Sequence, residues 1–248
     1  LNSAGASGTY VDKTANTNKA IAISGLALQG THASRYSVQA PSDVVGTVTQ
    51  ASLTTAGIVV VARAYDGTRT ATINSTNYSF AGVFGSDAVV LDASNYGALY
   101  DTATASTSKS VTVSALALSG TDAANYTLVQ PMLVGAINKA TATVIFSTPL
   151  SVVYDATSRA VGTTTTPSAL TVVVQYSGRG ATSFATSTTG PIDAGSYGVA
   201  ASINETNYLG TNAADFTIEK QLLPVALETA ALTTTFTGRA RFVAATTM

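Results

Sequence analysis

One stretch of the chain occurs twice, first as Lys19-Ala-Ile-Ala-Ile-Ser-Gly-Leu-Ala-Leu-Gln-Gly30 and again 90 residues later as Lys109-Ser-Val-Thr-Val-Ser-Ala-Leu-Ala-Leu-Ser-Gly120. In both copies apolar side chains alternate with small or polar ones, which is the period of a β-strand with one buried face. The apolar phase then shifts by one position. Because a shift of one residue would turn the wrong face to the core, we expect a β-bulge or a strand break at Ser24-Gly25 and at Ser114-Ala115.

The repeat divides the chain into modules. Tyr65-Asp-Gly-Thr-Arg69, Tyr154-Asp-Ala-Thr-Ser-Arg159 and Phe236-Thr-Gly-Arg239 are early landmarks of successive modules. A last strand and a polar joint mark the module ends at Ile137-Asn-Lys-Ala140 and Ile218-Glu-Lys-Gln221. A period of this size indicates an array of domains rather than a solenoid. We expect the C-terminal part of a truncated module at 1–50, complete modules at 51–139 and 140–220, and the start of a further, truncated module at 221–248.

Composition favours a folded β-protein and excludes several kinds of partner. Hydrophobic residues make up 46% of the chain and charged residues 10%, so the chain has enough apolar surface for more than one core. A net charge of −1 with scattered basic residues argues against nucleic acid as a partner. The sequence has no apolar run of the roughly 18 to 20 residues that would span a bilayer, so we expect no membrane insertion in this segment. The absence of cysteine excludes disulfides and thiolate metal sites.

The expected fold is all-β, with tandem immunoglobulin-like β-sandwich modules in an extended array. In Leu170-Thr-Val-Val-Val-Gln-Tyr176 one face is apolar throughout, as in a strand that covers a sandwich core. Asp193-Ala-Gly-Ser-Tyr197-Gly-Val199 resembles the corner of such sandwiches, where a buried Tyr donates its hydroxyl to upstream backbone. The same spacing places corners at Tyr126 and Tyr36. In the module at 140–220, Asn207-Tyr208 remains an alternative to Tyr197 as the corner.

These landmarks resemble the YDG and MBG repeat modules of very large bacterial surface adhesins of the filamentous haemagglutinin type. Tyr65-Asp-Gly-Thr68, the stretch 111–120 and Asn125-Tyr126-Thr-Leu128 resemble the YDG kind, so 1–50 and 51–139 are expected to be YDG-like. Tyr154-Asp155, Asp193–Tyr197, Asn207-Tyr208 and Phe216-Thr-Ile218 resemble the MBG kind, so 140–220 and 221–248 are expected to be MBG-like. The resemblance implies secretion, β-sandwich modules and a role in display or adhesion, with no catalytic residues to carry over.

Nothing in the sequence marks an active site. His32 is the single histidine, and no Gly-x-Ser-x-Gly nucleophile elbow is present. Aspartates occur singly, without the spacing of a calcium loop, so turn capping is the expected role. Lysines at the joints and at the start of a strand do not indicate an isopeptide cross-link. We therefore expect no enzyme, no catalytic residue, no cofactor and no metal.

Two functions fit these expectations. The first is a structural stalk or spacer segment of a secreted adhesin, located outside the cell or on the bacterial surface, whose partners are the neighbouring modules of the same chain. The second is a ligand-binding adhesin module that takes a surface glycan or protein on the Tyr-bearing loops of Tyr78, Tyr96 and Tyr208.

Overall fold

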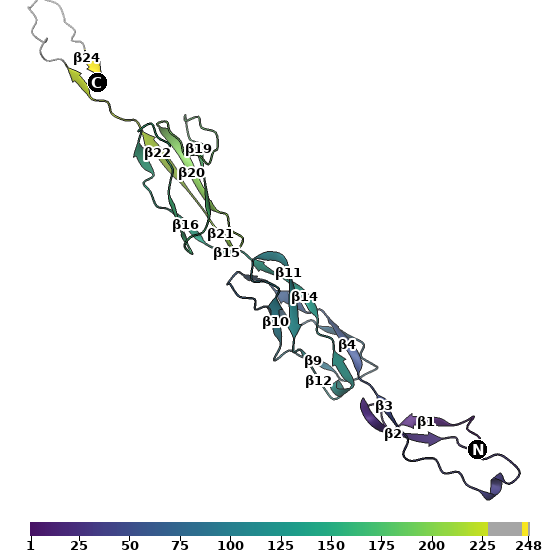
Figure 1. Ribbon diagram of the computed structural model, residues 1–248. Helices are drawn as coiled ribbons and strands as arrows, with labels where there is room; N and C mark the ends of the chain where they lie inside the picture. The colour runs from purple at the N-terminus through teal and green to yellow at the C-terminus, as the bar shows by residue number, and fades with distance from the viewer. Residues whose placement is uncertain (228–244, 248) are drawn as a thin grey trace, which may run out of the picture. The chain divides into compact units, whose positions relative to one another are not determined.

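The computed structural model describes residues 1–227 and 245–247 and divides into two compact units, Leu1–Asn138 and Lys139–Met248 (Figure 1). The expectation of an all-β protein is confirmed. Among the described residues, the only helical elements are two 3-10 turns, Ala33–Arg35 and Ala123–Asn125.

The first unit contains both copies of the repeat. The first copy forms one antiparallel sheet in the order β1-β2-β3, from β1 (Ser7–Tyr10), β2 (Asn16–Ser24) and β3 (Val45–Val48). The complete module that follows is built from β4 (Ala51–Ala56), β5 (Val59–Val61), β6 (Arg63–Ala64), β7 (Thr72–Asn74), β8 (Ser79–Ala81), β9 (Val90–Asp92), β10 (Gly97–Tyr100), β11 (Ser106–Ser114), β12 (Ala117–Ser119), β13 (Tyr126–Leu128) and β14 (Met132–Asn138).

The sheets of the complete module enclose one core. Its main sheet has the order β10-β11-β14-β6, and the smaller sheets are β13-β4-β8, β12-β9 and β5-β7. The buried residues come from both groups of strands and are Ile58, Ala71, Ile73, Leu91, Ala98, Tyr100, Val111, Val113, Leu116 and Ile137. Alternate residues of β11 are buried in this core, so one face of the main sheet packs towards the smaller sheets.

The break expected after Ser24 and Ser114 is confirmed in both copies. β2 ends at Ser24 and β11 ends at Ser114, and the next residue adopts a positive φ, 73° at Gly25 and 57° at Ala115. This left-handed residue reorients the chain, so that Leu116 enters the core although it is out of phase with β11.

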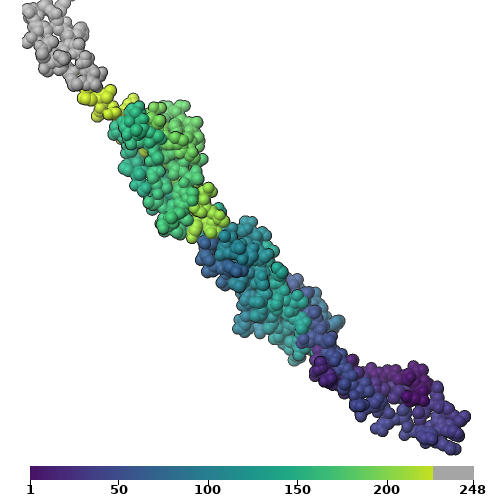
Figure 2. Space-filling view, viewed as in Figure 1, coloured from purple at the N-terminus to yellow at the C-terminus, as the bar shows by residue number. Residues whose placement is uncertain are grey.

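The second unit has its own strands and cores. Its strands are β15 (Ala140–Thr141), β16 (Thr143–Phe146), β17 (Ser151–Val153), β18 (Thr163–Thr166), β19 (Val172–Gly178), β20 (Gly195–Ile203), β21 (Tyr208–Leu209) and β22 (Thr211–Glu219). The main sheet has the order β17-β22-β20-β19, and β16 pairs with β18. Two clusters of buried residues lie against this sheet. In the space-filling view the green residues of this unit fill one continuous body (Figure 2).

The interpretation of 221–248 as the start of a further module falls largely outside the described residues. Within them, β23 (Val225–Leu227) pairs antiparallel with β24 (Ala245–Thr247).

Candidate functional site

Tyr197 makes the contacts of a tyrosine corner. Its ring is 2% exposed and lies edge-on to Phe184, with ring centroids 5.5 Å apart. Its hydroxyl donates a 2.6 Å hydrogen bond to the backbone oxygen of Asp193, four residues upstream. Burial, and then the nearby Asp193 carboxylate, raises the pKa of Tyr197. This bond ties the start of β20 to the preceding turn.

Tyr126 is buried in the same way but its hydroxyl is used differently. The hydroxyl accepts the N–H of Phe84 at 3.0 Å and donates to Asp87 Oδ2 at 2.8 Å. These partners lie about 40 residues upstream in sequence, so the local bond back to nearby backbone that defines a corner is not formed. Tyr126 instead fastens the 84–87 loop to β13, and burial raises its pKa.

Tyr36 departs further from the expectation, because its side chain is 73% exposed. The 84–87 loop, which receives the matching tyrosine in the second copy, has no counterpart in residues 1–50. The corner interpretation of Tyr36 is therefore wrong for this structure.

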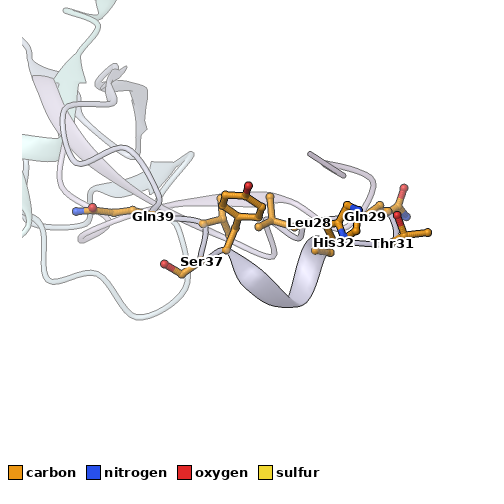
Figure 3. Close-up of a pocket in the computed structure, with 10 residues that line it drawn as sticks. Leu28, Gln29, Thr31, His32, Ser37 and Gln39 are labelled. Atoms are coloured by element: carbon orange, nitrogen blue, oxygen red, sulfur yellow. The ribbon is translucent and has the colours of Figure 1, made fainter.

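An open hollow of about 630 Å³ lies beside Tyr36. Figure 3 shows Gln29, Thr31 and His32 on one side of it and Ser37 and Gln39 on the other, with side chains that do not converge on a common point. In the second copy the matching face is covered, because β12 pairs with β9. The hollow thus lies on a face that is covered by another strand in the second copy. It lacks the convergent polar groups of a ligand-binding site.

The three tyrosines proposed for binding loops pack against the cores. The hydroxyl of Tyr78 accepts the N–H of Leu91 at 3.1 Å, and that of Tyr96 accepts the N–H of Ile73 at 3.2 Å. Tyr208 lies in β21 and packs against the core cluster near β16. All three rings are half-buried, so they do not form the free aromatic platform that the binding interpretation requires.

Two further tyrosines are fully buried: Tyr176, on the face of Leu170–Tyr176 that was expected to cover the core, and Tyr100, which was not expected there. The Tyr176 hydroxyl accepts the N–H of Val161 at 2.7 Å, and the Tyr100 hydroxyl donates to the oxygen of Ala136 at 3.1 Å. Each residue continues an apolar alternation, Val172-Val174-Tyr176 in one unit and Ala98-Tyr100 in the other. The period of the strands was therefore the signal that could also have found Tyr100.

The two Tyr-Asp landmarks form the same turn. Asp66 Oδ1 accepts the N–H and the hydroxyl of Thr68, and Asp155 Oδ1 accepts those of Thr157. These hydrogen bonds lower the pKa of both carboxyls. The residue between them has a positive φ in both cases, 81° at Gly67 and 63° at Ala156, so the missing glycine leaves the turn in place. Turn capping by aspartate accords with what the sequence suggested.

Two lysines, Lys109 and Lys19, are buried and paired with aspartates, which was not predicted from the sequence. Lys109 is 6% exposed and its ammonium lies 3.0 Å from Asp101 Oδ1, and Lys19 pairs with Asp12 in the first copy. The hydrogen bond from Lys109 lowers the pKa of Asp101. An isopeptide bond between Lys109 and Asp101 would require a neutral amine to attack a protonated carboxyl, so the ionised form of Asp101 disfavours a cross-link between these two residues.

The densest group of charges within the first unit joins the two copies of the repeat. Lys13 forms ion pairs with Asp87 and with Asp122, the latter at 3.2 Å, and both carboxylates raise the pKa of its ammonium. Beside them, the Ala15 N–H donates to Asn125 Oδ1 at 2.8 Å. Lys13, Asp87, Asn125 and Phe84 are among the residues that line a cavity of about 250 Å³. The arrangement holds one repeat to the next and leaves its charges paired.

Two structural features are absent from the part of the chain that the structure describes. There, no three His, Cys, Asp or Glu residues gather in a way that could hold a metal ion. No helix in that part is long and apolar enough to cross a membrane.

Comparison with known proteins assigns the two complete modules. No curated protein and no solved structure matches the chain. The family model for the YDG domain matches residues 49–132, and a family model for the MBG domain matches residues 140–222. Two successive regions of the chain thus match these family models, and they are called here the YDG domain and the MBG domain.

Proposed function

We propose that this chain is a structural spacer segment in the stalk of a secreted bacterial cell-surface adhesin and that it performs no catalysis. The YDG and MBG domains support this proposal because the modules they resemble occur in such adhesins. On this proposal both domains are immunoglobulin-like sandwiches. The Tyr197 corner and the sheets that face a common core support that fold.

The observation that carries the proposal is the use that each domain makes of its polar side chains. A site for a substrate needs polar groups that converge on a pocket and are free to meet a ligand. Here buried tyrosine hydroxyls satisfy backbone groups, and aspartates cap turns. The buried lysines are paired with aspartates. These groups stabilise the modules and are not available for chemistry.

The binding alternative has less support. Tyr78, Tyr96 and Tyr208 pack against the cores and are half-buried, so each ring offers a glycan only part of its surface. A glycan array probed with the full chain tests this directly. Saturable binding to one glycan class would favour the adhesin module over the spacer.

Surface display tests the spacer function itself. The full chain is anchored on a bacterium through its C-terminus and carries an epitope tag at its N-terminus. Energy transfer is then measured from a labelled antibody fragment on the tag to a membrane dye. Deleting residues 139–222 should bring the tag closer and raise the transfer. A chain with the tag beside the anchor is the control and should not respond to the deletion. An unchanged transfer in the N-terminally tagged chain would refute the spacer function.

A further inference from the structure

In each complete domain, two of the first three strands pair in parallel with the last two strands. In the MBG domain, β17 pairs with β22 in the register Ser151↔Thr217, Val152↔Ile218 and Val153↔Glu219. Hydrogen bonds extend the pair on both sides, from the Thr217 N–H to the oxygen of Leu150 at 2.9 Å and from the Tyr154 N–H to the oxygen of Glu219 at 2.9 Å. A second parallel pair joins β15 to β21. The strands where the chain enters the domain are thus bonded to those where it leaves.

The YDG domain repeats this topology. β6 pairs in parallel with β14, and the Tyr65 N–H extends the pair to the oxygen of Asn138 at 2.8 Å. β4 pairs in parallel with β13, and the Val129 N–H donates to the oxygen of Leu53 at 2.9 Å. The same two pairings occur in two domains of different families.

Parallel pairing of terminal strands decides how a domain responds to tension along the chain. The entering strand is pulled from its N-terminal end and the leaving strand from its C-terminal end. Two parallel strands have these ends at opposite sides of the sheet, so tension slides one strand along the other. Every hydrogen bond between them is then strained at the same time. Strands pulled apart from one end would instead lose their bonds one after another.

From this geometry we infer that the paired terminal strands β17–β22 and β6–β14 are shear clamps that make each domain resist unfolding under tension. The inference rests on the proposed spacer function for its biological setting, since a stalk that links a surface to a bound target carries tension. The resistance itself follows from the strand topology of each domain.

The Tyr-Asp landmarks lie at the end of each clamp. Tyr154 donates the last hydrogen bond of the β17–β22 pair, and the Asp155 turn follows at once. Arg159 pairs with Asp155 and also donates to the oxygen of Val153, so it ties the turn back to the strand. Arg63 does the same in the YDG domain through Asp66 and the oxygen of Ala64. These contacts hinder the slip by which a sheared strand would change register.

Single-molecule force spectroscopy on the full chain tests the clamp. The chain has no cysteine, so handles attach cleanly to cysteines added at its two ends. Each of the two domains should release roughly 250 to 300 Å of chain when it unfolds, given at most ~3.6 Å per extended residue. The YDG domain serves as an internal standard for variants in the MBG domain.

The matched variants are Val152→Pro and Val153→Pro. Since the Tyr154 N–H points at β22 and N–H groups two residues apart point the same way, the Val152 N–H also faces β22. The Val153 N–H faces the open edge of the sheet, because β17 is an edge strand. Proline removes the N–H in either case. Val152→Pro should lower the rupture force of the MBG domain clearly more than Val153→Pro, with the YDG force unchanged. Equal effects of the two variants would overturn the clamp.

A change of pulling direction tests the clamp without removing a hydrogen bond. Handles on Val153→Cys and Glu219→Cys, which lie opposite each other, peel β17 from β22. Bonds broken in sequence should give a rupture force roughly two-fold or more below that for end-to-end pulling. Similar forces in both directions would overturn the inference. Both experiments use the isolated chain, so failure of the clamp is distinguishable from failure of the spacer function, which the display experiment reports.

Discussion

Tyr176→Phe and Tyr197→Phe each remove one hydroxyl from a buried tyrosine of the MBG domain, and they should lower the free energy of unfolding by different amounts. Tyr176 and Tyr197 are both 2% exposed, so the two Tyr→Phe changes remove the same atom from equally buried rings. The Tyr176 hydroxyl accepts the N–H of Val161, whose side chain is also buried. Tyr176→Phe leaves that N–H without an acceptor and without water. We expect a loss of about 1–3 kcal/mol in the free energy of unfolding.

Tyr197→Phe removes a donor from a carbonyl that water can reach, because Asp193 is exposed. The expected loss is that of an ordinary hydrogen bond, about 0.5–1.5 kcal/mol. Phe also keeps the contacts of the ring with Phe184 and Phe216. Tyr176→Phe should therefore be the more destabilising change, although Tyr197 is the one marked by a recognisable motif.

Hydrogen exchange with peptide-level mass spectrometry measures both changes in the full chain. It reports the opening free energy of each segment, and peptides from the first unit provide the unchanged reference. With 1.4 kcal/mol equal to a factor of ten, exchange in β19 and β20 should rise about fivefold to a hundredfold in Tyr176→Phe. In Tyr197→Phe the rise should be about twofold to tenfold. Equal rises in exchange, or a larger rise in Tyr197→Phe, would refute the claim that the Val161 N–H, left without an acceptor, makes Tyr176→Phe the more destabilising change.

Three further changes probe other parts of the two domains. Ala156→Gly should stabilise the MBG domain by about 0.5–1 kcal/mol in chemical denaturation, because it relieves a positive φ of 63° at the cost of a more flexible unfolded chain. Gly135→Ala should destabilise the YDG domain by about 1–3 kcal/mol, since its Cβ would lie 2.5 Å from Val60 Cγ1; an unchanged denaturation midpoint would contradict that packing. The pKa of Asp101 is lowered in the folded state by Lys109, so its stabilisation is present at neutral pH and is lost as the pH falls below about 4. Asp101→Asn should lower the stability at pH 7 and flatten its fall in acid, as measured by urea denaturation at several pH values.

The local features of the fold could be predicted from sequence because they depend on neighbours along the chain. Alternation marks which faces of β11 and β19 are buried, and the phase shift marks the break after Ser114. The turn at Asp66 needs only a residue two positions further on. The Tyr197 bond spans four residues. In each case the residues that make the contact are within one short window of sequence.

The features that were not predicted depend on partners distant in sequence, or on a charged or turn-associated residue that packs against the core. The Tyr126 hydroxyl meets a loop about 40 residues away, which no local spacing could indicate. Lys109 continues the buried phase of Lys109-Val111-Val113, although a lysine is seldom found on the core face of a strand. Its stem can follow the core face while its ammonium reaches Asp101. Tyr78 and Tyr96 follow turn residues, and their rings fold back onto the core.

Parallel pairing between early and late strands of each domain could not be read from sequence at all, since alternation shows which face of a strand is buried but not which strand lies beside it. Because the chain has no cysteine, this pairing matters for how the domains resist tension. A disulfide keeps its loop closed under tension, and these domains have none. Resistance to tension must then come from non-covalent contacts, among which several hydrogen bonds strained together resist more than the same number strained in turn. On this inference, a chain built from such domains carries tension through its backbone ladders, and the Arg159–Asp155 and Arg63–Asp66 pairs hold the register of the strands.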